Sequence, residues 1–330
     1  MARVLYVHSR RNTFINIDRD ALAERVEVVD HYQPSLKPSP IALWKGVRSC
    51  DVVFGWFASW HTFFALTLAW ILRKPSVLVF GGFDTAAMPE IGYGSQRGGV
   101  RARMVRWTIS RATRLITNSH YSHGEIEQNL GIDPKRVKVV YHGIPDRFGE
   151  LDPAIERKRM ALTVGAVYDV NVERKGHGPF LEAAAALPDV EFVLVGEWWD
   201  ETGEQLAAKA APNASLTGHL SDPELDDLFR TTAVYVQASL HEGFGLSLAE
   251  AMLAGAVPIV TGAGALPEVV GDVGIYIDEP TPEAIAEAIG RALEMGPGAH
   301  AQARARIRDN FPFEMRRDGI CEQVDSALSA

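Results

Sequence analysis

The feature that most constrains the fold is an alternation of short apolar runs with segments of helical periodicity, which occurs twice along the 330 residues. Runs such as Val52–Gly55 and Val257–Val260 are continuously apolar, which is typical of strands buried on both faces of a parallel sheet. Helix-length patterns separate these runs. The alternation therefore predicts βαβ units, that is, an α/β fold with two Rossmann-like halves.

The sequence pattern predicts six strands in each half. In the first half we expect strands at Arg3–His8, Val26–Asp30, Val52–Gly55, Ser76–Phe80, Leu115–Asn118 and Val137–Tyr141, and helices at Trp60–Arg73, Val100–Thr113 and Ser122–Asn129. In the second half we expect strands at Met160–Val164, Glu191–Val195, Ser215–Thr217, Val234–Gln237, Val257–Val260 and Gly274–Ile277. Its helices are expected at Gly178–Leu187, Thr202–Ala211, Asp222–Arg230, Gly245–Ala254, Leu266–Val270 and Thr281–Glu294, two of them starting at Pro223 and Pro282 behind Ser221 and Thr281 as caps.

Length and composition favour two domains of ordinary size. Pro153 and the charged run Glu156–Arg159 indicate a linker, so we predict domains at 1–149 and 150–312. The last helix, at about 313–330, is expected to pack back on the first domain. Sheets of this kind bind ligands beyond the carboxyl ends of their strands, and two halves facing each other would form a cleft.

Charge is divided unevenly between the halves. Residues 1–150 carry 20 Lys and Arg against 13 Asp and Glu, whereas residues 151–330 carry 13 against 29. The stretch Arg97–Arg114 alone carries six Arg, and Arg103, Arg106 and Trp107 would share a helix face able to touch anionic lipid or a phosphorylated acceptor. A soluble helix with one charged face explains the same pattern. The acidic chain as a whole argues against nucleic acid as a partner.

One apolar segment, Trp56–Leu72, has the minimum length for a membrane span, but its polar residues and flanking strand patterns favour a crossover helix. The first residues read as a strand and not as a signal peptide. The two cysteines, Cys50 and Cys321, have neither a disulfide pattern nor metal-binding spacing. We therefore expect a cytoplasmic protein, with peripheral contact at the inner face of a membrane as an option.

The stretch Ser239–Gly255 places two acids, Glu242 and Glu250, around a Gly-Phe-Gly turn and a helix start. Gly243 and Gly245 allow a ligand to approach the backbone, and the free N–H groups of a helix start suit a pyrophosphate. Glu250, about two turns into the helix, could accept the hydroxyls of a ribose. The alternative for Glu250 is a buried acid satisfied by backbone N–H groups or by a cation.

Two further loops are expected at the same ligand. After the strand Met160–Val164, Arg174 and Lys175 are predicted at a helix start, where they would supply positive charge to phosphate oxygens. In a solvated loop the same pair would have no such role. Gly196 ends the next strand, and Leu220 precedes the helix Asp222–Arg230.

Together these features resemble glycosyltransferase family 4, retaining enzymes of the GT-B fold that use nucleotide sugars. The most specific part is Glu242–Pro258, continued by Leu266–Val270, which is similar to the family's signature of two glutamates separated by seven residues. In the first half, Asn118–Ser122 and Val139–Phe148 are similar to the segment that leads into the family's linker.

The resemblance implies a role for each matching residue. Glu242 would hold hydroxyls of the donor sugar, Lys175 would neutralise the leaving diphosphate, and Glu250 would hold the ribose. Backbone near Leu220 would meet the base, and Gly196 would line the donor loop. The remaining donor contacts would come from the amides of Gly243, Phe244, Gly245 and Leu246.

The chain departs from the family pattern in two places. Ala166 follows Gly165 where the family often has Arg, so either Arg174 supplies the second positive charge or the site has Lys175 alone. The first loop lacks glycine, and the fourth strand ends without the family's His. Asp84 is the nearest titratable group there, either as an acceptor-orienting or basic residue or as a loop cap.

The resemblance implies a retaining glycosyltransferase of glycan biosynthesis, which moves a hexose from a UDP- or GDP-linked donor to a hydroxyl of a sugar, a lipid-linked or a small-molecule acceptor. No Asp-x-Asp pair suited to a divalent ion occurs, so we expect neither a required metal nor another cofactor. An epimerase of the same fold, a phosphorylase and a non-catalytic nucleotide-sugar-binding protein are the alternatives.

Overall fold

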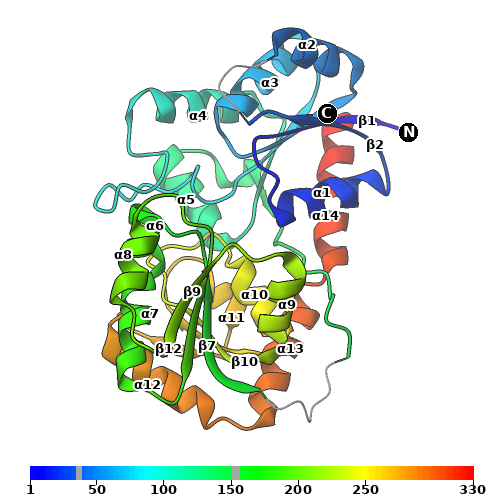
Figure 1. The fold of residues 1–330 in the computed structure, drawn as a ribbon. Helices are drawn as coiled ribbons and strands as arrows, with labels where there is room; N and C mark the ends of the chain where they lie inside the picture. Colours follow the sequence, from blue (N-terminus) through cyan, green and yellow to red (C-terminus); the bar gives the residue numbers. More distant parts are fainter. Residues whose placement is uncertain (35–38, 151–156) are drawn as a thin grey trace. The chain divides into compact units, whose positions relative to one another are not determined.

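The computed structural model describes residues 1–34, 39–150 and 157–330. The chain divides into two compact units, Met1–Gly143 with Phe313–Ala330, and Ile144–Pro312 (Figure 1). The residues 144–149, which the sequence assigns to the first domain, belong to the second unit. Pro153 and Glu156 of the predicted linker lie outside the described residues, whereas Lys158 and Arg159 begin a strand.

The first unit is a six-stranded parallel sheet in the order β2-β1-β3-β4-β5-β6. Its strands are β1 (Arg3–His8), β2 (Glu27–Tyr32), β3 (Val52–Trp56), β4 (Ser76–Val79), β5 (Arg114–Thr117) and β6 (Val137–Val139). One apolar core joins this sheet to α2 (Pro40–Ser49), α3 (Trp60–Ile71), α4 (Gly99–Arg111) and α5 (His120–Leu130). A second core, on the other face, joins it to α1 (Thr13–Ala23) and α14 (Phe313–Leu328).

A buried ion pair fastens α14 into this unit. The Arg316 guanidinium donates to both carboxylate oxygens of Asp18 in α1, at 2.9 and 2.7 Å, and to the carbonyl oxygen of Val140 at 2.6 Å. Arg316 and Asp18 are both almost completely buried. Because a buried guanidinium needs all of these acceptors, the pair specifies where α14 lies against α1.

The second unit is also a six-stranded parallel sheet, in the order β12-β11-β10-β7-β8-β9. Its strands are β7 (Lys158–Val164), β8 (Glu191–Val195), β9 (Ala214–Gly218), β10 (Thr232–Gln237), β11 (Val257–Thr261) and β12 (Ile275–Ile277). The order runs outward from β7 in one direction and from β10 in the other, as in a Rossmann sheet. Loops at the carboxyl ends of β7 and β10 therefore flank the topological switch point, where such sheets bind ligands.

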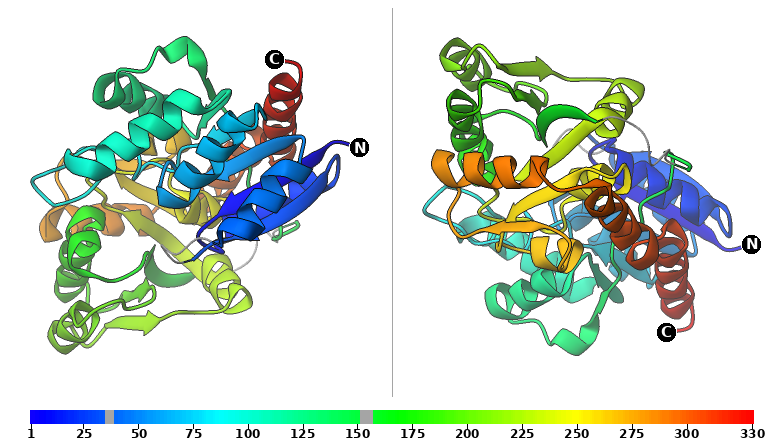
Figure 2. Two further views of the ribbon diagram at one scale, coloured as in Figure 1. Left: turned by 90° about the horizontal axis from the view of Figure 1, so that it is seen from above. Right: turned by 90° about the horizontal axis from the view of Figure 1, so that it is seen from below.

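Helices cover both faces of the second sheet, as the two end-on views in Figure 2 show. They are α6 (Asp169–Lys175), α7 (His177–Ala183), α8 (Thr202–Lys209), α9 (Asp222–Thr231), α10 (Leu246–Leu253), α11 (Leu266–Val270), α12 (Pro282–Leu293) and α13 (Pro297–Asn310). Ser221 forms a capping box with Glu224, and the Thr281 side chain caps α12, which confirms the two predicted helix starts.

The twelve predicted strands are confirmed, with ends that differ by a few residues. Four helices were not predicted: α1, α2, α6 and α13. In α13 only Ala299, Ala303 and Ile307 are buried, so the helix has little apolar periodicity, and α6 has only seven residues. The apolar segment near Trp56 forms β3 and the crossover helix α3. No helix within the described residues is long and apolar enough to cross a bilayer.

Candidate functional site

An ion pair joins the two loops that flank the switch point of the second sheet. The Lys175 Nζ lies 2.8 Å from Glu242 Oε1, and an Arg174 nitrogen lies 3.6 Å from Glu242 Oε2. Arg174 and Lys175 follow β7, whereas Glu242 follows β10. The three residues predicted from separate motifs are thus brought together at the ends of adjacent strands.

The local position of the two cations corrects the sequence prediction. Arg174 and Lys175 form the last turn of α6, and the predicted helix start follows directly after them, at His177 of α7. At the end of α6 their charges face the negative end of the helix dipole. Gly176 then takes a left-handed backbone with φ of 68°, and a Cβ there would lie 2.4 Å from the Ala238 carbonyl oxygen. This close approach brings Lys175 to the β10 loop.

Arg174 is held by more partners than Lys175. It is buried, and it donates from Nε and Nη2 to Asn171 Oδ1 at 3.1 and 2.6 Å and from Nη1 to the His241 carbonyl oxygen at 2.7 Å. Gln237 donates to Glu242 Oε1 at 3.3 Å. Arg174 is consequently a fixed charge, and the Lys175 ammonium donates a hydrogen bond to the Glu242 carboxylate at 2.8 Å.

The electrostatics of the cluster keep Glu242 ionised. Burial opposes its ionisation, but the charges of Lys175 and Arg174 outweigh burial and lower the pKa of Glu242 to about 2. Burial lowers the pKa of Lys175, and the ion pair with Glu242 opposes that effect. Burial, together with both cations, lowers the pKa of the neighbouring His177 to about 3, so this imidazole is neutral at physiological pH.

Two glycines let the loops after β7 and β8 touch. A Cβ on Gly196 would lie 1.9 Å from the Gly165 carbonyl oxygen, and a Cβ on Gly165 would lie 2.5 Å from Cδ of Lys175. Any larger residue at either position would displace backbone or the lysine stem. Gly196 therefore supports the path of Lys175, in addition to any contact with a ligand.

The Gly-Phe-Gly turn leads directly into α10. Gly245 is its N-cap residue, with a left-handed backbone of φ 96°, and the helix begins at Leu246. The Phe244 ring is buried and packs edge-on against Phe311 at 5.4 Å, so this side chain belongs to the packed interior of the unit. Tyr235 accepts from the Val164 N–H at 3.2 Å and donates to Ser247 at 2.8 Å, which ties the end of β7 to this helix start.

Glu250 has a cation partner that the sequence did not identify. Arg147 donates to Glu250 Oε1 at 2.9 Å and to Asp226 at 2.6 Å. Burial raises the pKa of Glu250, while Arg147 lowers it. This contact matches the alternative interpretation of Glu250 given by the sequence, a buried acid that is satisfied by a cation.

Asp84 and Leu220 are the two remaining residues that the sequence predicted for the site. Asp84 lies in the first unit, where its two carboxylate oxygens accept from the N–H groups of Ala58 and Gly81 at 2.8 and 2.9 Å. Burial raises its pKa to about 6 against those hydrogen bonds. The geometry is that of a loop cap, and the raised pKa would also suit a proton acceptor. Leu220 is half-buried between β9 and α9.

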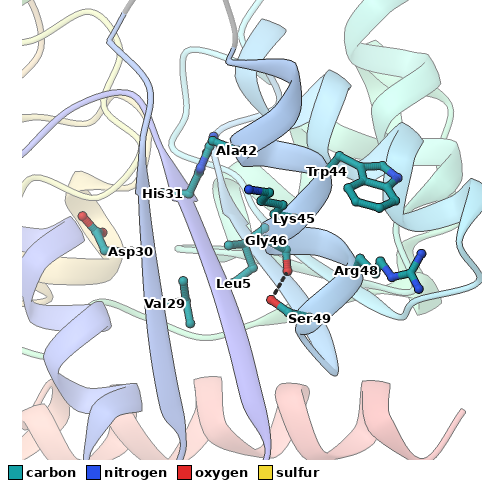
Figure 3. A pocket seen from close by; sticks show the side chains of 10 residues that line it. All are labelled: Leu5, Val29, Asp30, His31, Ala42, Trp44, Lys45, Gly46, Arg48 and Ser49. Carbon is teal, nitrogen blue, oxygen red and sulfur yellow. Dashed lines mark hydrogen bonds between the residues drawn. The ribbon is translucent and has the colours of Figure 1, made fainter.

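An open hollow of about 680 Å³ lies in the first unit between α2 and the strands β1 and β2 (Figure 3). Its lining includes Lys45, Arg48 and Trp44, and none of the predicted site residues. Within the described ranges no group of three or more His, Cys, Asp or Glu side chains could hold a metal ion.

Sequence reasoning missed several residues of the second-unit site. Arg147, Asp226, Asn171 and His177 carry no motif of their own. Gly264 was also missed: its φ is 63°, and a Cβ there would lie 2.4 Å from the Glu242 carbonyl oxygen, so the loop after β11 supports Glu242. Only Arg147 stood within a segment that resembled a family motif.

Comparison with known proteins identifies both halves. The family model described as Glycosyltransferase Family 4 matches residues 10–148, and the model described as Glycosyl transferases group 1 matches residues 158–295. O-antigen chain mannosyltransferase B of Escherichia coli is 27% identical over 202 residues, 57% of this chain and 53% of that protein. The D-inositol 3-phosphate glycosyltransferase of Streptomyces scabiei is 30% identical over 246 residues, 67% of this chain and 55% of that protein. The chain spans about half the length of the curated relatives it matches.

Solved structures show the same fold. Anabaena HepE in complex with UDP-glucose has a TM-score of 0.79 at 19% identity, over 99% of this chain and 100% of that one. Sucrose-phosphate synthase from Thermosynechococcus elongatus has a TM-score of 0.77 at 15% identity, with full coverage of both chains. The two parallel sheets are therefore the two Rossmann-like halves of a GT-B fold. With a family model matched to each half, the chain belongs to the family 4 glycosyltransferases.

Proposed function

We propose that this chain transfers a hexose from a nucleoside diphosphate, UDP or GDP, to an acceptor hydroxyl with retention of the anomeric configuration. The observation that carries the proposal is the Lys175–Glu242 pair at the switch point, beside the Gly245 turn and the start of α10. Cations and helix-start amides suit a diphosphate, and a carboxylate suits sugar hydroxyls. The curated relatives are named as glycosyltransferases, which supports the proposal.

In the proposed reaction the cations would stabilise the leaving group, and Glu242 would orient the donor sugar. As the glycosidic bond breaks, negative charge develops on the leaving phosphate, and Lys175, the fixed charge of Arg174 and the amides of Gly243–Leu246 would stabilise it. Glu242 would orient the sugar through its hydroxyls. The departing phosphate oxygen would take the acceptor proton on the same face of the sugar, so no protein nucleophile and no metal ion are required.

The remaining assignments follow from position. Glu250 would hold the ribose through the carboxylate oxygen that does not contact Arg147, the backbone near Leu220 would meet the base, and Gly196 would line the donor loop. Asp84, in the first unit, would orient the acceptor. A lipid-linked acceptor would have to be reached at a membrane surface. The basic stretch Arg97–Arg114 is the segment that we propose to contact that surface.

The Glu250→Ala variant is expected to weaken nucleotide binding by about 10- to 100-fold, because a hydrogen bond to a charged group contributes about 1.5–3 kcal/mol. At a fixed nucleotide concentration, weaker binding stabilises the folded protein less and raises its melting temperature less. The check is the rise in melting temperature caused by UDP or GDP, with Glu204→Ala, an exposed acid of α8, as the matched control. An unchanged nucleotide shift in Glu250→Ala would refute the ribose role.

The rival activities are separated by one incubation. The protein is mixed with UDP- and GDP-sugars, with and without candidate acceptor sugars, and products are resolved by mass spectrometry. Transfer predicts a new glycoside only when the acceptor is present. A changed sugar nucleotide without acceptor would indicate an epimerase, and binding without any product under all conditions would indicate a non-catalytic module.

A further inference from the structure

Three neighbouring helices of the first unit carry no acidic residue. Helices α2, α3 and α4 contain no Asp or Glu, while α2 and α4 carry six Lys and Arg. Their buried faces share one core, so they lie side by side on one face of the sheet (Figures 1 and 2). A solvated helical layer of this size ordinarily mixes both signs of charge. The absence of acids from these helices points to a polyanionic partner.

Aromatic side chains gather with cations where α3 and α4 end. We call Trp70, Ile71, Arg73, Lys74, Trp107 and Arg111 the Trp70 patch. Trp70 is 50% exposed, Ile71 62% and Trp107 38%. The Trp70 and Trp107 rings meet edge-on at 6.3 Å, and the Arg111 guanidinium lies 4.2 Å from each ring centroid. All of the patch residues except Trp107 also border an open hollow of about 740 Å³, which Leu328 lines as well.

The cations of the patch are not neutralised by the protein. In the parts of the chain that the structure describes, no carboxylate lies within ion-pair distance of Arg73, Lys74 or Arg111. The buried Nε of Arg111 has no hydrogen-bond partner among the described residues. Three cations beside exposed tryptophans thus lack an anion.

The backbone at Arg73 is unusual. Arg73 follows the end of α3 with a left-handed φ of 54°, a position that glycine ordinarily occupies after a helix. An arginine there carries a backbone strain that glycine would not have. Strain retained at an exposed cation is a reason to look for a function of the charge.

We propose that the Trp70 patch docks on the surface of an anionic lipid bilayer. Indole rings favour the interface between headgroups and acyl chains, and Ile71 adds apolar area that would be buried there. Arg73, Lys74 and Arg111 would pair with lipid phosphates, at a gain of about 1 kcal/mol for each cation near the surface. Contact would be peripheral, and it needs no donor nucleotide, so it stands independently of the proposed transfer reaction.

The test measures co-sedimentation of the full chain with vesicles of phosphatidylcholine alone and of equal parts phosphatidylcholine and phosphatidylglycerol. We expect binding to the anionic vesicles only, reduced by added salt. The double variant Trp70→Ala/Trp107→Ala should partition at least about tenfold less. Trp199→Ala, which removes a 49% exposed tryptophan of the second unit, is the matched control and should bind normally.

The Arg73→Gly variant separates docking from folding. Glycine relieves the left-handed strain, so thermal stability should be kept or raised, while loss of one cation should weaken vesicle binding about fivefold. That combination supports the proposal. It would be overturned if wild-type protein ignores anionic vesicles at low salt, if it binds heparin but not vesicles, or if Arg73→Gly and the folded double tryptophan variant bind as well as the wild type.

Discussion

The Glu242→Ala variant should lose transfer activity by on the order of 10²- to 10³-fold, the size expected when one interaction with the reacting group is removed. The variant loses the carboxylate that would orient the donor sugar, and Lys175 loses its partner at 2.8 Å. The fold should survive, because burial already lowers the pKa of Lys175 and the unpaired amine can be deprotonated. The measurement is the initial rate of nucleoside diphosphate release with donor and acceptor, beside a thermal melt.

The control for this variant is Glu173→Ala. Glu173 is an exposed acid of α6, two positions before Lys175 in the sequence, and it should retain near-normal activity. If Glu242→Ala keeps its melting temperature and also works at a near-normal rate, Glu242 does not belong to the donor-sugar site.

The Arg316→Ala variant should destabilise the first unit by about 3–5 kcal/mol, because it leaves the Asp18 carboxylate buried without its cation. The variant also loses the hydrogen bond that the Arg316 guanidinium donates to the Val140 carbonyl oxygen in the native fold. Urea denaturation followed by circular dichroism measures the loss. The double variant Asp18→Leu/Arg316→Met should regain much of the stability, since it removes both charges at once.

A surface pair provides the contrast. Arg25 and Asp318 are 2.7 Å apart, but both side chains are about half exposed. Arg25→Ala should therefore cost no more than about 1 kcal/mol. Equal losses for Arg25→Ala and Arg316→Ala would contradict the view that the buried pair anchors α14.

The strands could be predicted from the sequence because burial on both faces leaves a continuous apolar run, as in Val257–Thr261. The helices α1 and α13 escaped prediction because their buried residues are few or interspersed with charge. The second-unit α6 escaped because a helix of seven residues has too few turns to show a period. Its absence from the prediction is also why Arg174 and Lys175 were expected at a helix start.

The site was predictable where a residue stood in a dense motif. Glu242, Glu250 and the Gly245 turn lie within one strand–loop–helix unit, so their spacing in sequence reports their spacing in space. The contact of Lys175 with Glu242 joins loops 67 positions apart, and that of Arg147 with Glu250 spans 103. Pairing of β7 with β10 creates the first contact, and no local pattern reports which strands pair. Gly264 escaped for the same reason, because its need for glycine comes from the distant Glu242 backbone.

Calorimetric titration of UDP, GDP and ADP into the wild type and into Lys175→Gln tests the donor site most directly. A donor site at the switch point predicts that UDP or GDP binds the wild type with one site per chain. Its affinity should fall by at least about tenfold in Lys175→Gln, because the lysine charge faces the diphosphate. If no nucleoside diphosphate binds at millimolar concentration, or if Lys175→Gln binds as tightly as the wild type, the donor site is not at the switch point between β7 and β10.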